Sequence, residues 1–375
     1  MDKIIFISEM RNPKRDASST QIMVRNILSG MNKIANRLIF VPIITKDCCC
    51  QDVLDYYQDI ADEIIFADSL FEKCNGRYAA MFRMFFASFR KPNQLNKLKL
   101  DSDSIIVTHS PTIDSVLYAK EIKRINPNVK VIQYWSDPIT LSLQIISDYN
   151  FKRVLFRYVE NKILGYSDAI VYGTKSLYEN QKKFFSKHSS KMGYCDVCYN
   201  PLNKDSRNSN NKILFGYFGN YYSKIRNIIP FYRTFQKINS ANLIVCGSGD
   251  AVLESNNQIQ ILSRVSQHDV VALESQIDVE VCILNKAGFQ IPGKIFYATN
   301  TNKKILVLLD GPVADDIYQY LKTFKRFIFC ENNETSIFNT INEIVAGKYD
   351  EIDKSELYKL TPQYVAQSIL NGGYK

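Results

Sequence analysis

Strand-like and helix-like segments alternate along this chain, and this alternation restricts its fold more than any other feature. In the first half, short apolar runs of β-type composition occupy residues 3–8, 37–44, 64–67, 104–108, 129–134 and 169–172. Segments with helical spacing lie between them, at residues 21–34, 113–125 and 151–165. Strands that alternate with helix-length segments form βαβ units, which build a parallel sheet.

The alternation is interrupted at residues 204–211, a polar run without apolar residues that is typical of a linker. It then restarts, with strands predicted at 213–217, 241–246, 258–262, 279–283, 304–309 and 326–330. Helix-like segments lie between them, one of them at residues 294–299. We therefore predict an α/β protein with two Rossmann-like parallel-sheet domains, 1–204 and 205–356, that face a central cleft. A helix within about residues 357–375 is expected to pack back on the first domain.

Composition favours a globular protein that stays in the cytoplasm. Hydrophobic residues make up 46% of the chain and charged residues 23%, which is the balance of an ordinary folded domain. The longest apolar runs have the length of a strand, far below the roughly 20 residues of a membrane-spanning helix. The first residues show neither the apolar region nor the cleavage site of a secretory signal.

The formal charge of +9 predicts an anionic partner, but charge alone does not choose among nucleic acid, membrane and phosphorylated small molecule. The segment from Arg77 to Lys91 interleaves basic and aromatic residues. It suits either an anionic membrane surface or an ordinary packed helix with snorkelling arginines. Cys195 and Cys198 form a lone C-x-x-C without a second pair, so no metal site is predicted.

Three loops that follow predicted strands in the second half suit a phosphate group. The first contains Gly219 and leads to Arg226, the second is the turn from Gly247 to Gly249, and the third runs into Lys294. Glycines let the backbone approach an anion, and the cations add charge. For each of these loops, the other interpretation is a tight turn that binds no ligand.

The third loop belongs to a stretch that resembles a known family. From Pro292 to Leu306 the chain is similar to the P-x-K-x-[FY]-E-Y-x-x-x-x-K-P-[IV]-L block of GT-B glycosyltransferases, particularly family 4 and its relatives. Further segments resemble the family in the same order along the chain, at residues 167–174, 200–201, 218–227, 243–249 and 265–284. The resemblance covers most of the chain and implies sugar transfer from a nucleotide-sugar donor without a metal or other cofactor.

The resemblance also assigns residues to the two substrates. Those implied in donor binding are Gly219, Asn220, Arg226, Gly247, Ser248, Gly249, Ile291, Pro292, Gly293, Lys294 and Tyr297. Ser18 and Ser19 fall where the family has a loop near the acceptor, and His109 and Asp137 fall where first-domain groups face the cleft. Asp137 is the candidate base for the acceptor hydroxyl if the enzyme inverts, and a helix cap is its other interpretation.

The chain departs from the family at the donor ribose. Tyr297 stands in place of the glutamate that binds the ribose, Lys304 replaces the following proline, and the earlier glutamate of the E-x₇-E pattern has no match. The leading hypothesis is transfer to a saccharide or polyprenyl-linked saccharide acceptor in surface polysaccharide synthesis, on the inner face of the membrane. The alternative is a catalytically inactive, glycosyltransferase-like binding partner. Nucleic acid is not predicted, because only the charge suggests it.

Overall fold

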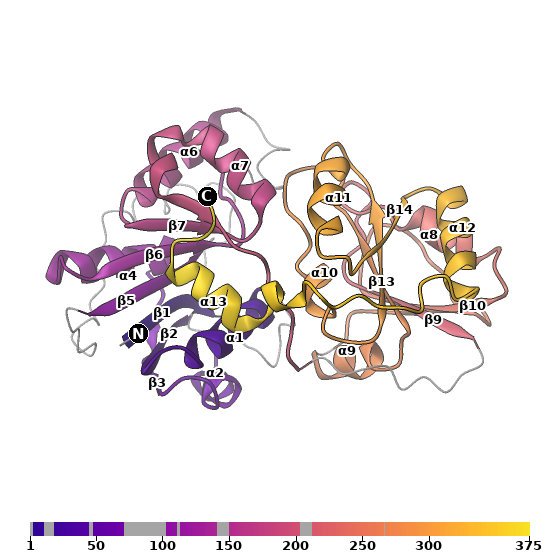
Figure 1. Ribbon diagram of the computed structural model, residues 1–375, viewed down its shortest axis with the longest axis horizontal. Helices are drawn as coiled ribbons and strands as arrows, with labels where there is room; N and C mark the ends of the chain where they lie inside the picture. The colour runs from indigo at the N-terminus through magenta and orange to yellow at the C-terminus, as the bar shows by residue number, and fades with distance from the viewer. Residues whose placement is uncertain are drawn as a thin grey trace. The chain divides into compact units, whose positions relative to one another are not determined.

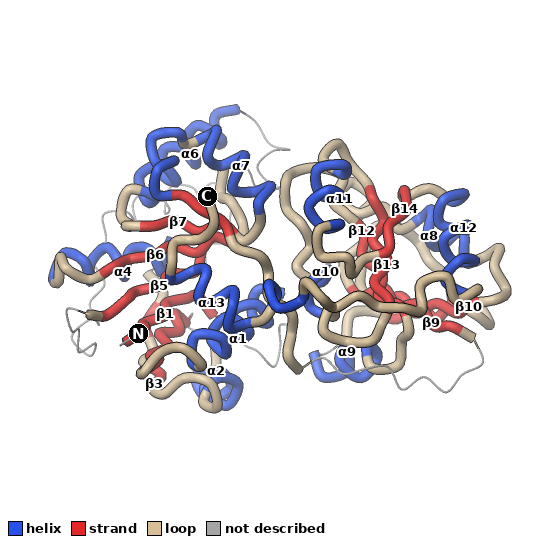
Figure 2. Tube along the Cα trace, viewed as in Figure 1, coloured by secondary structure: helices blue, strands red, loops and turns tan. Residues whose placement is uncertain are grey.

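The computed structural model describes residues 3–10, 19–44, 48–70, 103–110, 113–140, 150–202, 212–265 and 267–375. The chain divides into two units (Figures 1 and 2). The first contains residues Met1–Cys198 and Thr361–Lys375, and the second contains Tyr199–Leu360. The segment from Arg77 to Lys91 and Ser18 lie outside the described residues.

The first unit has a parallel sheet in the order β3-β2-β1-β5-β6-β7-β8, with β4 also paired to β2. Its strands are β1 (Lys3–Met10), β2 (Arg37–Ile44), β3 (Glu63–Ile64), β4 (Ala67–Asp68), β5 (Ser104–Ser110), β6 (Lys130–Trp135), β7 (Ala169–Tyr172) and β8 (Met192–Tyr194). Its helices are α1 (Ser19–Asn32), α2 (Cys50–Tyr57), α4 (Ile113–Ile125), α6 (Asn150–Leu164), α7 (Lys175–Phe184), the 3₁₀ helix η2 (Ser186–Lys191) and α13 (Pro362–Leu370).

The C-terminal helix α13 packs on α1 within the first unit (Figure 1). Thr361 caps its first turn by accepting a hydrogen bond from the Tyr364 N–H, and Pro362 occupies the first turn, where proline fits well. The two helices approach closely at Gly30, where an added Cβ would lie 2.0 Å from the Pro362 carbonyl oxygen. Tyr374 then forms an antiparallel bridge with Tyr194 of β8.

The second unit has a parallel sheet in the order β11-β10-β9-β12-β13-β14. Its strands are β9 (Ile213–Phe218), β10 (Ala241–Cys246), β11 (Ile259–Leu262), β12 (Val279–Ile283), β13 (Lys304–Leu309) and β14 (Ile328–Glu331). Its helices are α8 (Ile229–Phe235), α9 (Gln267–Glu274), α10 (Lys294–Tyr297), α11 (Ala314–Lys322), α12 (Glu334–Val345) and the 3₁₀ helix η3 (Leu357–Leu360).

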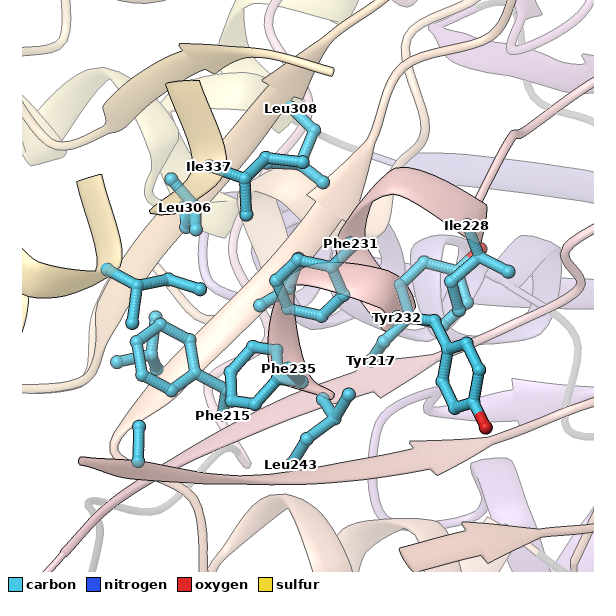
Figure 3. Close-up of a cluster of buried hydrophobic side chains, with 14 of the residues drawn as sticks. Phe215, Tyr217, Ile228, Phe231, Tyr232, Phe235, Leu243, Leu306, Leu308 and Ile337 are labelled. Carbon is cyan, nitrogen blue, oxygen red and sulfur yellow. The ribbon is translucent and has the colours of Figure 1, made fainter. Parts of the chain in front are cut away.

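Apolar residues cover both faces of this second sheet, as a parallel sheet requires. On one face, Phe215 of β9 packs against Phe231 and Phe235 of α8 (Figure 3). On the other, Phe218, Ile244, Cys246 and Ile277 form a smaller cluster. Because strand side chains alternate, Val279, Val281 and Ile283 of β12 join the first cluster while Glu280 and Cys282 face the other way.

Each sheet reverses its strand order at one point. In the first unit the chain moves outward from β1 to β2 and β3, and later outward in the other direction from β5 to β8. In the second unit the same reversal lies between β9 and β12. The connections at such a reversal leave in opposite directions from neighbouring strands, so a crevice opens beyond their carboxyl ends. These two edges are where ligand-binding residues are expected.

Several segments differ from the sequence-based expectation. The strand expected at 64–67 is two short pieces, β3 and β4, and α10 ends at Tyr297 rather than at residue 299. Strand β14 begins at Ile328 rather than at residue 326, and the Arg326 side chain is buried. Helix α10 ends early because the Thr299 N–H donates to the Phe296 carbonyl and the Thr301 N–H to the Ala298 carbonyl, so the chain continues in tight turns. The Arg326 guanidinium donates hydrogen bonds to the carbonyls of Thr299, Thr301 and Lys303 and so ties these turns to the segment before β14.

Candidate active site

Two of the predicted donor loops lie side by side in the second unit and are hydrogen-bonded to each other. The Gly219 N–H donates to the Cys246 carbonyl (3.0 Å), and the Tyr221 N–H donates to the Ser248 carbonyl (3.0 Å). The Ser248 hydroxyl donates to Oδ1 of Asn220 at 3.1 Å. The loop after β9 and the loop after β10 therefore form one continuous edge.

Gly247 and Gly249 are needed for this close approach. A Cβ on Gly247 would lie 2.0 Å from the Gly219 carbonyl oxygen, and one on Gly249 would lie 2.2 Å from the ring of Tyr221. Real side chains never approach backbone so closely, so any other residue would push the two loops apart. The G-x-G pattern thus has a reason in the packing of these loops, whatever they bind.

Arg226 connects the first loop to the third across the point where the sheet reverses. Its Nε donates to Oδ1 of Asn285 at 2.8 Å, and the buried Asn285 amide donates to the Gln290 carbonyl at 3.1 Å. The Lys286 N–H also donates to the Ile225 carbonyl at 2.8 Å. Burial raises the pKa of Tyr217 to about 12, while Arg226 acts in the opposite direction. The guanidinium is therefore held in a fixed place at the carboxyl edge.

Lys294, the first residue of α10, lies over the sheet face that Glu280 and Cys282 occupy. Its Nζ is 3.9 Å from a carboxylate oxygen of Glu274 and 5.9 Å from the centre of the Phe218 ring. Burial of Glu280, followed by repulsion from Glu274, raises the pKa of Glu280 to about 8, and Lys294 opposes this shift. The Lys294 ammonium thus sits among acidic groups, and its side chain remains about one-third exposed.

Cys282 is a buried thiol near the carboxyl end of β12. Burial and then Glu280 raise the pKa of this thiol, and both Lys294 and Arg226 act to lower it. The two predicted cations are held by different elements, since Arg226 is hydrogen-bonded to Asn285 after β12 and Lys294 lies over the ring of Phe218 in β9. Sequence reasoning missed Glu280 and Asn285, although an acidic residue in the otherwise apolar strand Val279–Ile283 was a visible signal.

The remaining donor-side residues shape the third loop. Ile291 is buried, and Pro292 and Gly293 accept hydrogen bonds from Ile295 and Phe296 in the turn that starts α10. Gly288 has a φ of 78°, a left-handed conformation that favours glycine. Tyr297 is only 5% exposed, and its carbonyl accepts a hydrogen bond from the Asn200 N–H at 3.1 Å.

In the first unit, His109 lies at the carboxyl end of β5, next to the reversal point. Its ring is buried between two hydroxyls, with Nδ1 3.0 Å from the Ser8 Oγ and Nε2 3.1 Å from the Ser136 Oγ. Burial lowers the pKa of His109 to about 4, so the ring is neutral at physiological pH. A neutral imidazole carries one N–H, so it donates to one of these hydroxyls and accepts from the other.

Asp137 follows β6 and is linked to His109 through Ser136, whose Oγ lies 3.5 Å from Oδ2 of Asp137. The structure thus brings together Ser8, His109, Ser136 and Asp137 at three neighbouring strands. Sequence reasoning missed both serines. Ser19 begins α1, the helix that follows β1, and Ser18 is outside the described residues.

A buried carboxylate is hydrogen-bonded to the loop that carries Asp137. Glu160 of α6 is fully buried and accepts hydrogen bonds from the Thr140 N–H (2.7 Å) and from the Gln181 amide (3.2 Å). Burial raises the pKa of Glu160 to about 7 even though these bonds favour the charged form. The sequence alone did not indicate this residue.

No residue cluster of the kind that holds a metal ion occurs in the part of the chain that the structure describes. Cys195 and Cys198 are buried free thiols whose pKa values are raised by burial. Within the described ranges, no helix has the length and apolar character to cross a bilayer.

Comparison with known proteins supports the fold. No family model matches the chain, and no curated protein matches it. Among solved structures, HepE from Anabaena in complex with UDP is similar with a TM-score of 0.57 and 12% identity, over 98% of this chain and 96% of that one. Sucrose-phosphate synthase from Thermosynechococcus elongatus gives 0.61 and 11%, over 100% and 95%.

A third similar structure is the UDP-GlcNAc 2-epimerase from Neisseria meningitidis bound to UDP-GlcNAc, with a TM-score of 0.54, 13% identity and 99% coverage of both chains. These similarities extend over nearly the whole chain. They confirm the predicted fold class, two parallel-sheet α/β units as in GT-B glycosyltransferases. A transferase and an epimerase share this fold, so the reaction has to be inferred from the site.

Proposed function

We propose that this protein is a glycosyltransferase that moves a sugar from a nucleotide-sugar donor to a saccharide or polyprenyl-linked saccharide acceptor, in surface polysaccharide synthesis. The observation that carries the proposal is the interlocking of three loops at the reversal point of the second sheet, where the loops after β9 and β10 are hydrogen-bonded to each other and Arg226 binds Asn285. The similar HepE structures contain UDP and UDP-glucose, which supports a nucleotide-sugar donor.

In the proposed reaction, the donor diphosphate lies against the loops that contain Gly219 and Gly247, and the Arg226 guanidinium neutralises its growing charge as the sugar leaves. Fixed cations and backbone N–H groups stabilise such a leaving group without reorganisation. No metal or other cofactor is included in the proposal. If the enzyme inverts, Asp137 in the first unit would accept the proton of the acceptor hydroxyl, with Ser136 and the neutral His109 orienting its carboxylate.

The test is Arg226→Ala, which should reduce donor turnover at least about a hundredfold, the size found when one transition-state donor is removed. Arg226 also tethers Asn285, so Asn285→Ala breaks the same hydrogen bond while keeping the charge. Arg233→Ala, on the exposed side of α8, removes an arginine remote from the loops. The phosphate role is refuted if Arg226→Ala turns over donor as fast as Arg233→Ala does, or no more slowly than Asn285→Ala.

A second candidate is a catalytically inactive binding partner, favoured by Tyr297 in place of the family's glutamate. Calorimetry with UDP-, GDP- and CMP-sugars separates the two functions, because the inactive protein should bind none of them. Donor turnover with and without a saccharide acceptor, followed by NMR, also shows whether the sugar is transferred to the acceptor, released to water or converted into an epimer.

We further propose that the enzyme works in the cytoplasm, on the inner face of the membrane, with the segment from Arg77 to Lys91 as one anionic-lipid contact. The basic character of the chain supports this location. Partition of the protein between membrane and soluble fractions, with and without a salt wash, tests it.

A further inference from the structure

A groove on the first unit remains unused by the proposed reaction. It lies between α6 and the turn that follows α7, has a volume of about 340 Å³, and is lined in part by Val154, Arg157, Tyr158, Phe184 and Lys187. We call it the α6 groove. Helix α7 starts after the carboxyl end of β7 and runs for ten residues, about 15 Å, before Lys187 is reached. The groove is thus away from the edge that holds His109 and Asp137.

The positive charges of the α6 groove have no acidic partner in the part of the chain that the structure describes. The Arg157 guanidinium lies 4.5 Å above the centre of the Phe184 ring, and that of Arg153 lies 5.5 Å from the same ring. Among the described residues, no carboxylate pairs with Arg153, Arg157 or Lys187. Stacking on Phe184 orders the arginines while leaving their N–H groups available, which is the arrangement that recognises phosphate.

The neighbouring histidine is affected by the same positive charge. Burial is the main cause that lowers the pKa of His188, and Lys191 and Lys187 lower it further. His188 Nε2 is hydrogen-bonded to the carbonyl and side chain of Asn161, another residue of the groove. His188 therefore adds no positive charge at physiological pH, and the charged residues that line the groove, Arg157 and Lys187, are both basic.

Exposed apolar surface lies beside these cations. Val154 is 66% exposed and Tyr158 is 55% exposed. With Arg157 and Asn161 they occupy positions three and four residues apart, so they share one face of α6. An exposed valine gains nothing from a free inorganic anion, whereas a partner that combines a phosphate with an acyl chain would contact both kinds of side chain.

We propose that the α6 groove binds the phosphate group of an anionic membrane lipid, with Arg157 and Lys187 on the phosphate and with Val154 and Tyr158 at the acyl boundary. This inference deepens the membrane part of the proposed function, and it uses neither the donor loops nor the segment from Arg77 to Lys91. An acidic protein partner would need the cations but not the exposed Val154, so it is an outcome of the test.

The experiment is sedimentation of the full chain with vesicles of phosphatidylglycerol in phosphatidylcholine, and with vesicles of phosphatidylcholine alone, in the absence of donor. The double substitution Arg157→Gln with Lys187→Gln should lower the partition coefficient on the order of thirtyfold, since each basic residue near an anionic surface contributes about fivefold. The matched control, Lys33→Gln with Lys212→Gln, removes the same charge from two exposed lysines elsewhere.

A fall of the same size in both double variants, or no fall in the groove variant, would overturn the proposal. The substitution Val154→Ser should also weaken vesicle binding, and an unchanged partition would point to an acidic protein partner instead. Glycerol 1-phosphate measured by calorimetry distinguishes the source, because binding of this ester without vesicle binding overturns the lipid assignment. The groove variant should bind the donor as tightly as the unsubstituted protein does. A negative result with vesicles therefore refutes the lipid proposal without refuting the proposed donor site.

Discussion

Replacing Glu160 with glutamine should remove a pH dependence from the stability of the first unit. Glu160 is fully buried, and its carboxylate accepts from the Thr140 N–H and the Gln181 amide. A glutamine side chain still offers an oxygen to Thr140. Its new N–H group would face Gln181, whose Oε1 has no hydrogen-bond partner among the described atoms and can accept after a flip of the amide. The fold should therefore tolerate Glu160→Gln.

The magnitude follows from the pKa. Burial raises the pKa of Glu160 from 4.5 to about 7, so the folded state holds this proton more tightly than the unfolded state. The protonated Glu160 side chain stabilises the folded state fully below pH 4.5, and this stabilisation is lost as the pH rises through 7. A shift of this size corresponds to about 3 kcal/mol of unfolding free energy, at 1.36 kcal/mol per unit. The Glu160→Gln variant should not lose unfolding free energy in this way. The difference in stability between this variant and the unsubstituted protein should therefore be largest above pH 7.

Trp135 provides the assay, because it is the one tryptophan of the chain, is fully buried in the first unit, and has its ring centre 6.5 Å from that of Tyr172. Urea unfolding followed by its fluorescence between pH 5 and pH 8 should show the midpoint of Glu160→Gln rising relative to the unsubstituted protein by about 1 M or more. Glu63→Gln, a half-exposed glutamate of the same unit that pairs with Arg37, is the control. Parallel midpoints of Glu160→Gln and the unsubstituted protein at every pH would refute the reasoning. The buried Asp114, whose pKa burial raises to about 7, adds a loss of the same sign to both proteins.

Two further substitutions test close approaches of the backbone. Gly30→Ala places a Cβ 2.0 Å from the Pro362 carbonyl oxygen, so α13 should loosen, at a cost of about 1–3 kcal/mol in unfolding free energy. The check is proteolysis of the C-terminus, and a higher melting temperature would contradict the packing, since alanine in an unobstructed helix stabilises. Gly247→Ala should separate the first two donor loops and weaken donor binding on the order of tenfold to a hundredfold in calorimetry. The control is Gly165→Ala, where the added Cβ has its nearest atom at 3.0 Å. Equal donor affinities of the Gly247→Ala and Gly165→Ala variants would contradict the role of Gly247.

Local patterns in the sequence were sufficient for the fold class. Strand and helix periods depend on residues a few positions apart, so the alternation and its interruption at residues 204–211 indicated two parallel sheets in tandem. The same patterns pointed to Gly247, Arg226 and Lys294, because residue type and position after a strand are also local properties. Lengths were less accurate, as α10 shows, because turn hydrogen bonds at Thr299 and Thr301 replace the expected last part of that helix.

The partners of those residues could not be predicted in this way. Arg226 and Asn285 are 59 positions apart, and Ser8 and His109 are 101 positions apart. Each pair meets because the sheet places their strands next to each other, in an order that differs from the order along the chain. The pKa values of Glu160, Glu280 and His109 likewise depend on burial, which is a property of the folded chain. The sequence by itself therefore determined the two α/β sheets and the types of residue at their edges. Only the tertiary structure decided which of these residues meet and which are charged, since both depend on contacts between distant parts of the chain.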